Sequence, residues 1–160
     1  MKASWMAGLS FGLTSGVITT LGLIVGLHAG THSRAVVLSG ITTIAVADAL
    51  SDALGIHLSE ESKNSGNVRH VWESTAATLV VKFGIALTFL LPVLSLPLQP
   101  AMVASLLWGL FLLTGLSYAL ARVQGIAPWK VIGEHVVIAV CVVVISHYVG
   151  DRVQSILNSP

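Results

Sequence analysis

The sequence is poor in charged residues, which make up 9% of its 160 residues, whereas hydrophobic residues make up 54%. Its mean hydropathy of +0.88 is far above that of an ordinary soluble domain. We therefore expect an integral membrane protein. The formal net charge is only +1, so no basic surface suggests a nucleic-acid partner.

Cysteine is almost absent, and the single Cys141 lies within an apolar run. One cysteine excludes both an intramolecular disulfide framework and a CxxC metal or redox site, so its expected role is packing. Enzymatic motifs are missing as well: no nucleophile and base stand out with a supporting third group, and no phosphate-binding glycine loop follows a strand. We expect neither an enzyme nor a resident cofactor.

Five apolar segments are long enough to cross a bilayer as helices, which takes about 20 residues each. Pro92, Pro97 and Pro100 end the third segment and form a short hairpin. We predict a single all-α domain, a bundle of five transmembrane helices at about residues 5–28, 35–58, 74–94, 101–121 and 131–149.

The first segment has no Lys, Arg, Asp or Glu between Ala3 and Ser33. Because that is too long for the apolar part of a signal peptide, we expect a retained span. Basic residues favour an amino terminus in the cytosol, since cytoplasmic loops carry an excess of Lys and Arg. Five would lie inside and two outside: Lys2, Lys63, Arg69, Arg122 and Lys130 against Arg34 and Arg152. We expect the cell membrane as the location.

The first span carries small residues along one face. Its six glycines, with Ser15 and Thr19, fall within an arc of roughly 120° on a helix. Such a face lets another helix approach closely, which is sufficient reason for the glycines. Ser15 and Thr19 differ because they place hydroxyl oxygens on this face. The glycines are Gly8, Gly12, Gly16, Gly22, Gly26 and Gly30.

Two acids, Asp48 and Asp52, lie inside the second span with Ser51 beside them. Four residues apart, they share one helix face. A bare charge at membrane depth costs at least a few kcal/mol, so a partner, a proton or a cation must offset it. Lys82 in the third span has a depth similar to that of Asp48, which allows an ion pair. That pair would leave the other acid to be protonated or bound to a cation.

Histidines and further acids lie near the ends of the spans. His57, Glu60 and Glu61 form either a cytoplasmic site that receives a divalent cation, for which imidazole and carboxylates are suitable ligands, or a solvated helix end. His28 and His32, near the turn between the first two spans, are either exit ligands and protonation sites or ordinary loop histidines. Both interpretations stay open for each group.

The chain resembles the vacuolar iron transporter family. The resemblance rests on four stretches that cover nearly the whole chain in order: TSGVITTLGLIVGL, ALSDALGIHLSEES, LLPVLSLPL and LLWGLFLLTGLSYALARVQGIAPWKVIGEHVVIAVCVVVISHYVG. Members of that family are five-span dimers whose first two helices line a central path for ferrous iron or manganese leaving the cytosol.

Carried over residue by residue, the resemblance places the first-span acid of the family on Ser15 and the second-span methionine on Asp52. A hard carboxylate thus replaces a soft thioether, which implies either an altered selectivity or a loss of iron transport. The cytoplasmic metal-binding region between the second and third spans is reduced here to Glu60, Glu61 and Glu73. In a homodimer, two copies of the acids and of Ser15 would form an oxygen-rich site suited to Mn²⁺, Fe²⁺ or Mg²⁺.

These observations lead us to expect a homodimeric exporter of a divalent cation, iron or manganese, working in exchange for protons. Its partners would be the lipid bilayer and the metal ion, and its expected metal-contacting residues are Asp48, Asp52, Ser51, Ser15, His57, Glu60 and Glu61. Two alternatives remain: a non-transporting scaffold that kept the fold and lost the ion path, and a transporter of another small solute.

Overall fold

The computed structural model describes residues 3–63 and 66–159. Within these ranges the chain forms six helices and no strand. The helices are α1 (Ala3–Thr31), α2 (Arg34–Lys63), α3 (Val68–Thr88), α4 (Leu90–Ser95), α5 (Leu98–Gln124) and α6 (Pro128–Leu157).

The predicted all-α class is confirmed, and five segments are long and apolar enough to cross a membrane. Four of them are single helices, and the fifth combines α3 with α4 across Phe89. All five extend beyond the ranges predicted from the sequence, because the helices continue into the polar ends of each apolar run. The protein is therefore an integral membrane protein.

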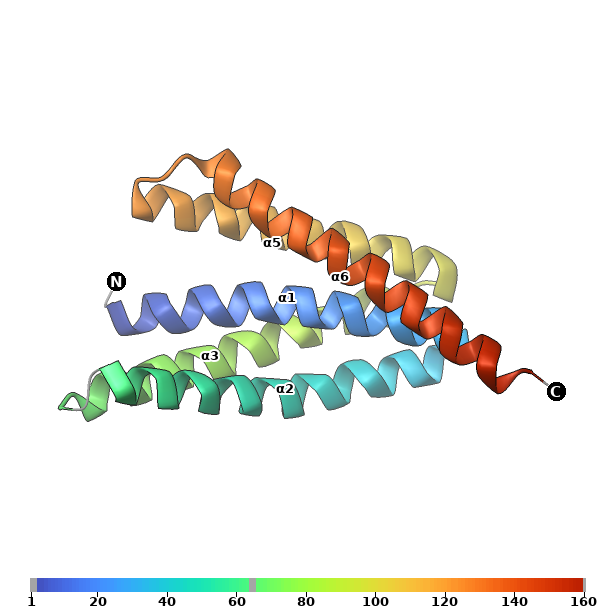
Figure 1. Cartoon of the computed structure of the whole chain (residues 1–160), viewed down its shortest axis with the longest axis horizontal. Coiled ribbons are helices and arrows are strands. Elements are labelled where there is room, and N and C mark those ends of the chain that lie inside the picture. The colour runs from blue at the N-terminus through green and yellow to red at the C-terminus, as the bar shows by residue number, and fades with distance from the viewer. Residues whose placement is uncertain (1–2, 64–65, 160) are drawn as a thin grey trace.

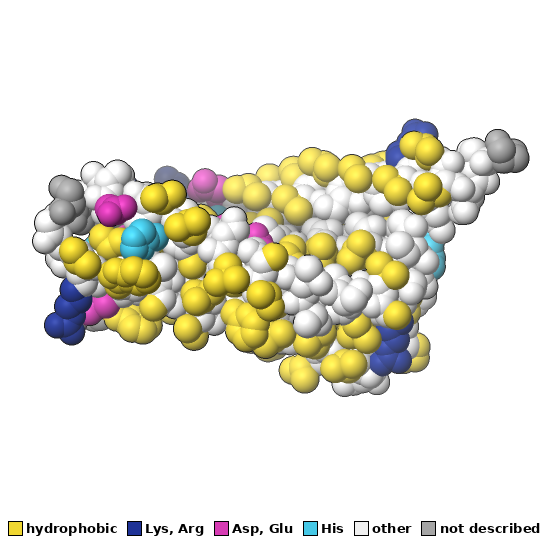
Figure 2. Space-filling model, turned by 90° about the horizontal axis from the view of Figure 1, so that it is seen from below, with side chains coloured by type: hydrophobic (Ala, Val, Ile, Leu, Met, Phe, Trp, Pro, Cys, Tyr) yellow, Lys and Arg dark blue, Asp and Glu magenta, His cyan; other side chains and the backbone are white. Residues whose placement is uncertain are grey.

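Helix α1 is the central element of the bundle and packs against α2, α3, α5 and α6. Figure 1 shows α1, α2 and α3 side by side, with α6 crossing α1 obliquely. The apolar core gathers around α1, and its members are Val17, Leu21, Ile24, Val37, Ile41, Phe89, Val93, Ala101, Met102, Leu113 and Ala139. Figure 2 shows a largely hydrophobic surface between ends that carry most of the visible charged side chains.

The glycine face of α1 is confirmed as a surface of close helix contact, but it is divided between two partners. Gly8, Gly12 and Gly16 face α3: a Cβ at Gly12 would lie 3.0 Å from the Thr78 carbonyl oxygen. Gly22, Gly26 and Gly30 face α6 instead. Because 3.6 residues do not divide evenly into a four-residue repeat, the small face drifts around the helix from α3 to α6.

Gly150 of α6 marks the tightest approach of α6 to α1. A Cβ there would overlap the carbonyl oxygen of Gly26 and lie 3.0 Å from the Cβ of Ala29. Since backbone atoms cannot rotate away, we expect Gly150→Ala to destabilise the protein by about 1–3 kcal/mol, the usual cost of overpacking.

The measurement is unfolding of the purified protein in detergent by heat or denaturant. Gly84→Ala is the matched control, because no atom lies within 4 Å of a Cβ at that position. Alanine is favoured over glycine inside a helix by roughly 0.5–1 kcal/mol, so the control should be neutral or stabilising. Equal behaviour of the two variants would contradict the close α1–α6 contact.

Candidate functional site

Lys82 of α3 lies at the centre of a polar cluster inside the bundle. Its side chain is only 2% exposed. The aliphatic stem passes against α1 at Gly16, where an added Cβ would lie 3.3 Å from Lys82 Cγ. The absence of a side chain at Gly16 thus allows the lysine to cross the α1–α3 contact and reach α2.

The ammonium group of Lys82 contacts both acids of α2. Its Nζ lies 2.7 Å from Oδ2 of Asp48 and also forms an ion pair with Oδ2 of Asp52. It donates a further hydrogen bond of 2.9 Å to the Ser15 hydroxyl. The predicted Asp48–Lys82 ion pair is confirmed, and the structure adds Asp52 as a second partner of the same lysine.

Two hydroxyls of α1 complete the cluster. Ser15 donates to Oδ2 of Asp52 at 2.8 Å, and Thr19 donates to Oδ2 of Asp48 at 2.8 Å. The Thr19 oxygen also lies 2.9 Å from the Ser15 carbonyl oxygen, so one hydroxyl proton is shared between two acceptors. All these contacts use the Oδ2 atoms, so each carboxylate keeps a second oxygen outside this set of bonds.

The charges of the cluster do not cancel. With both acids ionised and Lys82 protonated, two negative charges and one positive charge leave a net charge of −1. The side chains of Asp48 and Asp52 are 25% and 23% exposed, whereas Lys82 is enclosed. The excess negative charge is therefore on the open side of the cluster, where a cation or a proton can reach it.

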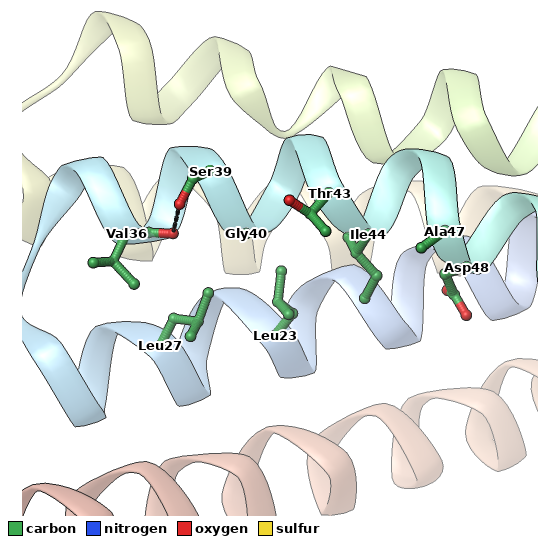
Figure 3. A pocket seen from close by; sticks show the side chains of 9 residues that line it. All are labelled: Leu23, Leu27, Val36, Ser39, Gly40, Thr43, Ile44, Ala47 and Asp48. Atoms are coloured by element: carbon green, nitrogen blue, oxygen red, sulfur yellow. Dashed lines mark hydrogen bonds between the residues drawn. The ribbon is translucent and has the colours of Figure 1, made fainter.

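Asp48 lies at one end of a groove between α1 and α2. The groove has a volume of about 590 Å³ and extends from Val36 near the start of α2 to Asp48. Figure 3 shows Leu23 and Leu27 of α1 along one side and the α2 residues along the other. Gly40 keeps the groove narrow, because a Cβ there would overlap the Leu27 side chain.

The remaining predicted metal residues are not brought into this cluster. Ser51 is exposed on α2. His57 contacts α3, with Nδ1 3.1 Å from the Thr75 hydroxyl and its ring 4.8 Å from the Trp72 ring. Thr75 also donates to the Val71 carbonyl oxygen at 2.8 Å, so this hydroxyl joins His57 to the backbone of α3.

Glu60 and Glu61 also separate from His57. Glu60 is 8% exposed and pairs with His70 at 3.0 Å and with Lys63 at 3.3 Å. Glu61 is exposed. His70 was not singled out from the sequence, although Asn67, whose side chain caps the first turn of α3, marks the helix start that presents it.

Among the described residues, no three His, Cys, Asp or Glu side chains form a set that could hold a metal ion. One chain therefore offers two carboxylates and two hydroxyls inside the bundle, held together by Lys82.

Comparison of the chain with protein-family models, with curated proteins and with solved structures gives no match.

Proposed function

We propose that the protein is a membrane transporter for a divalent cation, iron or manganese, which binds at Asp48 and Asp52. The observation that carries this proposal is the Lys82 ammonium group, which contacts both carboxylates inside an apolar bundle. An internal ammonium in contact with two acids occupies the position that a bound cation would take. A dication that enters from the open side competes with it for the same oxygens.

The ligand chemistry supports a hard or borderline cation. The oxygens near Lys82 belong to carboxylates and to the hydroxyls of Ser15 and Thr19. Carboxylate and hydroxyl oxygens suit Mg²⁺, Mn²⁺ and Fe²⁺ better than the metals that prefer thiolates. The resemblance to the vacuolar iron transporter family favours Fe²⁺ and Mn²⁺, and export from the cytosol in exchange for protons, within this group.

A homodimer would complete such a site. Helix α2 leaves Asp48 and Asp52 partly exposed, and Ser51 beside them is exposed. Polar groups that face lipid are unfavourable, so a second copy packed on this side of α2 would cover them. It would also bring together the Asp48 and Asp52 carboxylates of both copies. These four carboxylates would be enough to hold a dication once it has displaced Lys82 from them.

A scaffold without transport activity is the second candidate. The observation that favours it is the complete set of acceptors for Lys82, whose ammonium group contacts Asp48, Asp52 and Ser15. In this case the cluster would only join α1, α2 and α3. A transporter of another small solute would keep the cluster but show no response to metal.

Metal uptake by the purified protein in liposomes separates these candidates. We expect saturable uptake of Mn²⁺ and Fe²⁺ above that of protein-free liposomes. Because protons leave the lumen in exchange for the entering metal ions, the lumen should become more alkaline during uptake. A fluorescent metal indicator and a pH dye inside the liposomes measure the two flows. Uptake no greater than in protein-free liposomes, for every divalent ion tried, would favour the scaffold.

A further inference from the structure

A second groove follows the contact between α1 and α6. It has a volume of about 620 Å³ and extends along α1 from Thr19 to Thr31 and along α6 from Val142 to Leu157. Its lining is apolar or glycine except for three hydroxyl side chains, those of Thr19, Thr31 and Ser146. A bound water needs two to four polar partners, so this groove suits an apolar occupant.

The groove is open on the membrane-facing side of α6. Ile145, Val149 and Val153 line it, and all three side chains are exposed. Helix α6 is one of the five segments that can cross a membrane, and it crosses α1 obliquely (Figure 1). In a bilayer these side chains meet lipid acyl chains, which therefore have direct access to the groove.

The length of the groove matches one leaflet of a bilayer. The rise along α1 from Thr19 to Thr31 is about 18 Å, at about 1.5 Å per residue. The hydrocarbon core of a bilayer is about 30 Å thick, so one leaflet contributes about 15 Å. A transmembrane helix from a second copy would need a groove about twice as long. The dimensions therefore favour an acyl chain as the occupant.

A basic residue lies at the end of this groove. Arg152 is exposed and follows Ile145 by seven residues, so the two lie within about 20° of each other around α6. Gly150 packs against the last turn of α1, and Nε2 of Gln154 lies 3.2 Å from Nδ1 of His32. Arg152, between these two contacts, is therefore level with the end of α1, where the groove ends.

The guanidinium of Arg152 is available to an anion. None of the ion pairs within the described chain involves this residue. The neighbouring acid, Asp151, is exposed and lies about 100° away around the helix. Guanidinium groups bind phosphate through two parallel hydrogen bonds. A phosphate beside Arg152 and an acyl chain in the groove are the two parts of a phospholipid.

We propose that the groove between α1 and α6 binds one phospholipid with an anionic headgroup, whose phosphate contacts Arg152. A zwitterionic lipid binds less well, because its own cation competes for the phosphate. The acyl chain reaches Thr19, which lines the groove and donates a hydrogen bond to Asp48. This site does not depend on transport.

The bound lipid also borders the groove that leads to Asp48. Leu23 and Leu27 of α1 and Ile44 of α2 line both grooves (Figure 3). An acyl chain packed on these three side chains holds them against the groove between α1 and α2. The lipid thereby separates the polar cluster from the hydrocarbon on the α6 side.

Native mass spectrometry of the purified protein tests the proposal. The protein is titrated with phosphatidylglycerol or with phosphatidylcholine that has the same acyl chains. We expect one retained phosphatidylglycerol per chain and an affinity about tenfold above that for phosphatidylcholine, as expected for one hydrogen-bonded charge pair. Phosphatidylglycerol should also raise the melting temperature more than phosphatidylcholine does.

Two pairs of variants separate the chain site from the headgroup site. Val153→Trp fills the groove, and Val140→Trp is its matched control, because both valines lie on α6 and are 49% exposed but only Val153 lines the groove. The first variant should lose the retained lipid and the second should keep it. Arg152→Gln should lose only the preference for phosphatidylglycerol, whereas Arg122→Gln, at the other end of the bundle, should retain it.

Three results would overturn the proposal. The first is equal retention of the two lipids by the wild type, and the second is equal lipid retention by Val153→Trp and Val140→Trp. The third is a loss of dimer mass in Val153→Trp with lipid retention unchanged, which would assign the groove to a second copy. Asp48→Asn with Asp52→Asn should leave lipid retention unchanged, so this outcome is independent of the proposed transport.

Discussion

Replacing Asp48 and Asp52 together by asparagine is expected to abolish Mn²⁺ uptake into liposomes. Asparagine keeps the shape and the hydrogen bonds to Ser15 and Thr19, but it removes the negative charges that attract a dication. Moving a dication from water to membrane depth costs free energy of desolvation. Coordination by neutral oxygens alone offsets only a small part of that cost. Each single variant should lose most of the uptake, because one carboxylate would then be neutralised by Lys82.

Two controls accompany this experiment. Glu134→Gln removes an exposed acid of α6 outside the cluster and should leave uptake unchanged. The double variant also leaves Lys82 without a carboxylate, so a triple variant that adds Lys82→Met tests whether any loss comes from misfolding. Undiminished uptake in a folded double variant would reject Asp48 and Asp52 as the site.

Lys82→Ala should be the most destabilising single substitution in the bundle. Removing one partner of a buried ion pair typically costs about 3–5 kcal/mol, because the remaining charge stays buried and unpaired. Here two carboxylates lose the same partner, and the space left by a side chain that is 2% exposed adds a cavity. Thermal unfolding in detergent measures the effect.

The same variant discriminates between the two proposed functions. If the lysine occupies the position of a transported cation, Mn²⁺ should restore much of the stability of Lys82→Ala and raise its melting temperature more than that of the wild type. If the cluster is only structural, the triple variant with Asp48→Asn, Asp52→Asn and Lys82→Met should be as stable as the wild type, and Mn²⁺ should have no effect on either.

The sequence identified the central partners of the cluster because depth along a helix follows from residue counting. It placed Lys82 level with Asp48, and the ion pair is present. It could not show that Lys82 also reaches Asp52, because counting gives the depth of a side chain and not the direction from which a neighbouring helix approaches. That direction follows from the α1–α3 contact at Gly16.

The end of α2 shows the same limit. His57, Glu60 and Glu61 share one end of the helix, as the sequence predicted, but His57 and Glu60 contact different residues and Glu61 is exposed. Residues of α3 determine where these side chains lie, since His57 contacts Thr75 and Glu60 pairs with His70. Periodicity within one helix contains no information on which residues of the next helix lie opposite.

The division of the α1 glycines between α3 and α6 has an energetic consequence. The amino-terminal glycines of α1 contact α3 and the carboxyl-terminal glycines contact α6, so substitutions at Gly12 and Gly26 act on separate interfaces. Free-energy changes at distant sites without shared contacts add to within about 0.5 kcal/mol. The α1–α3 and α1–α6 interfaces can therefore change independently. We expect substitutions along α6 to leave Lys82, Asp48 and Asp52 undisturbed.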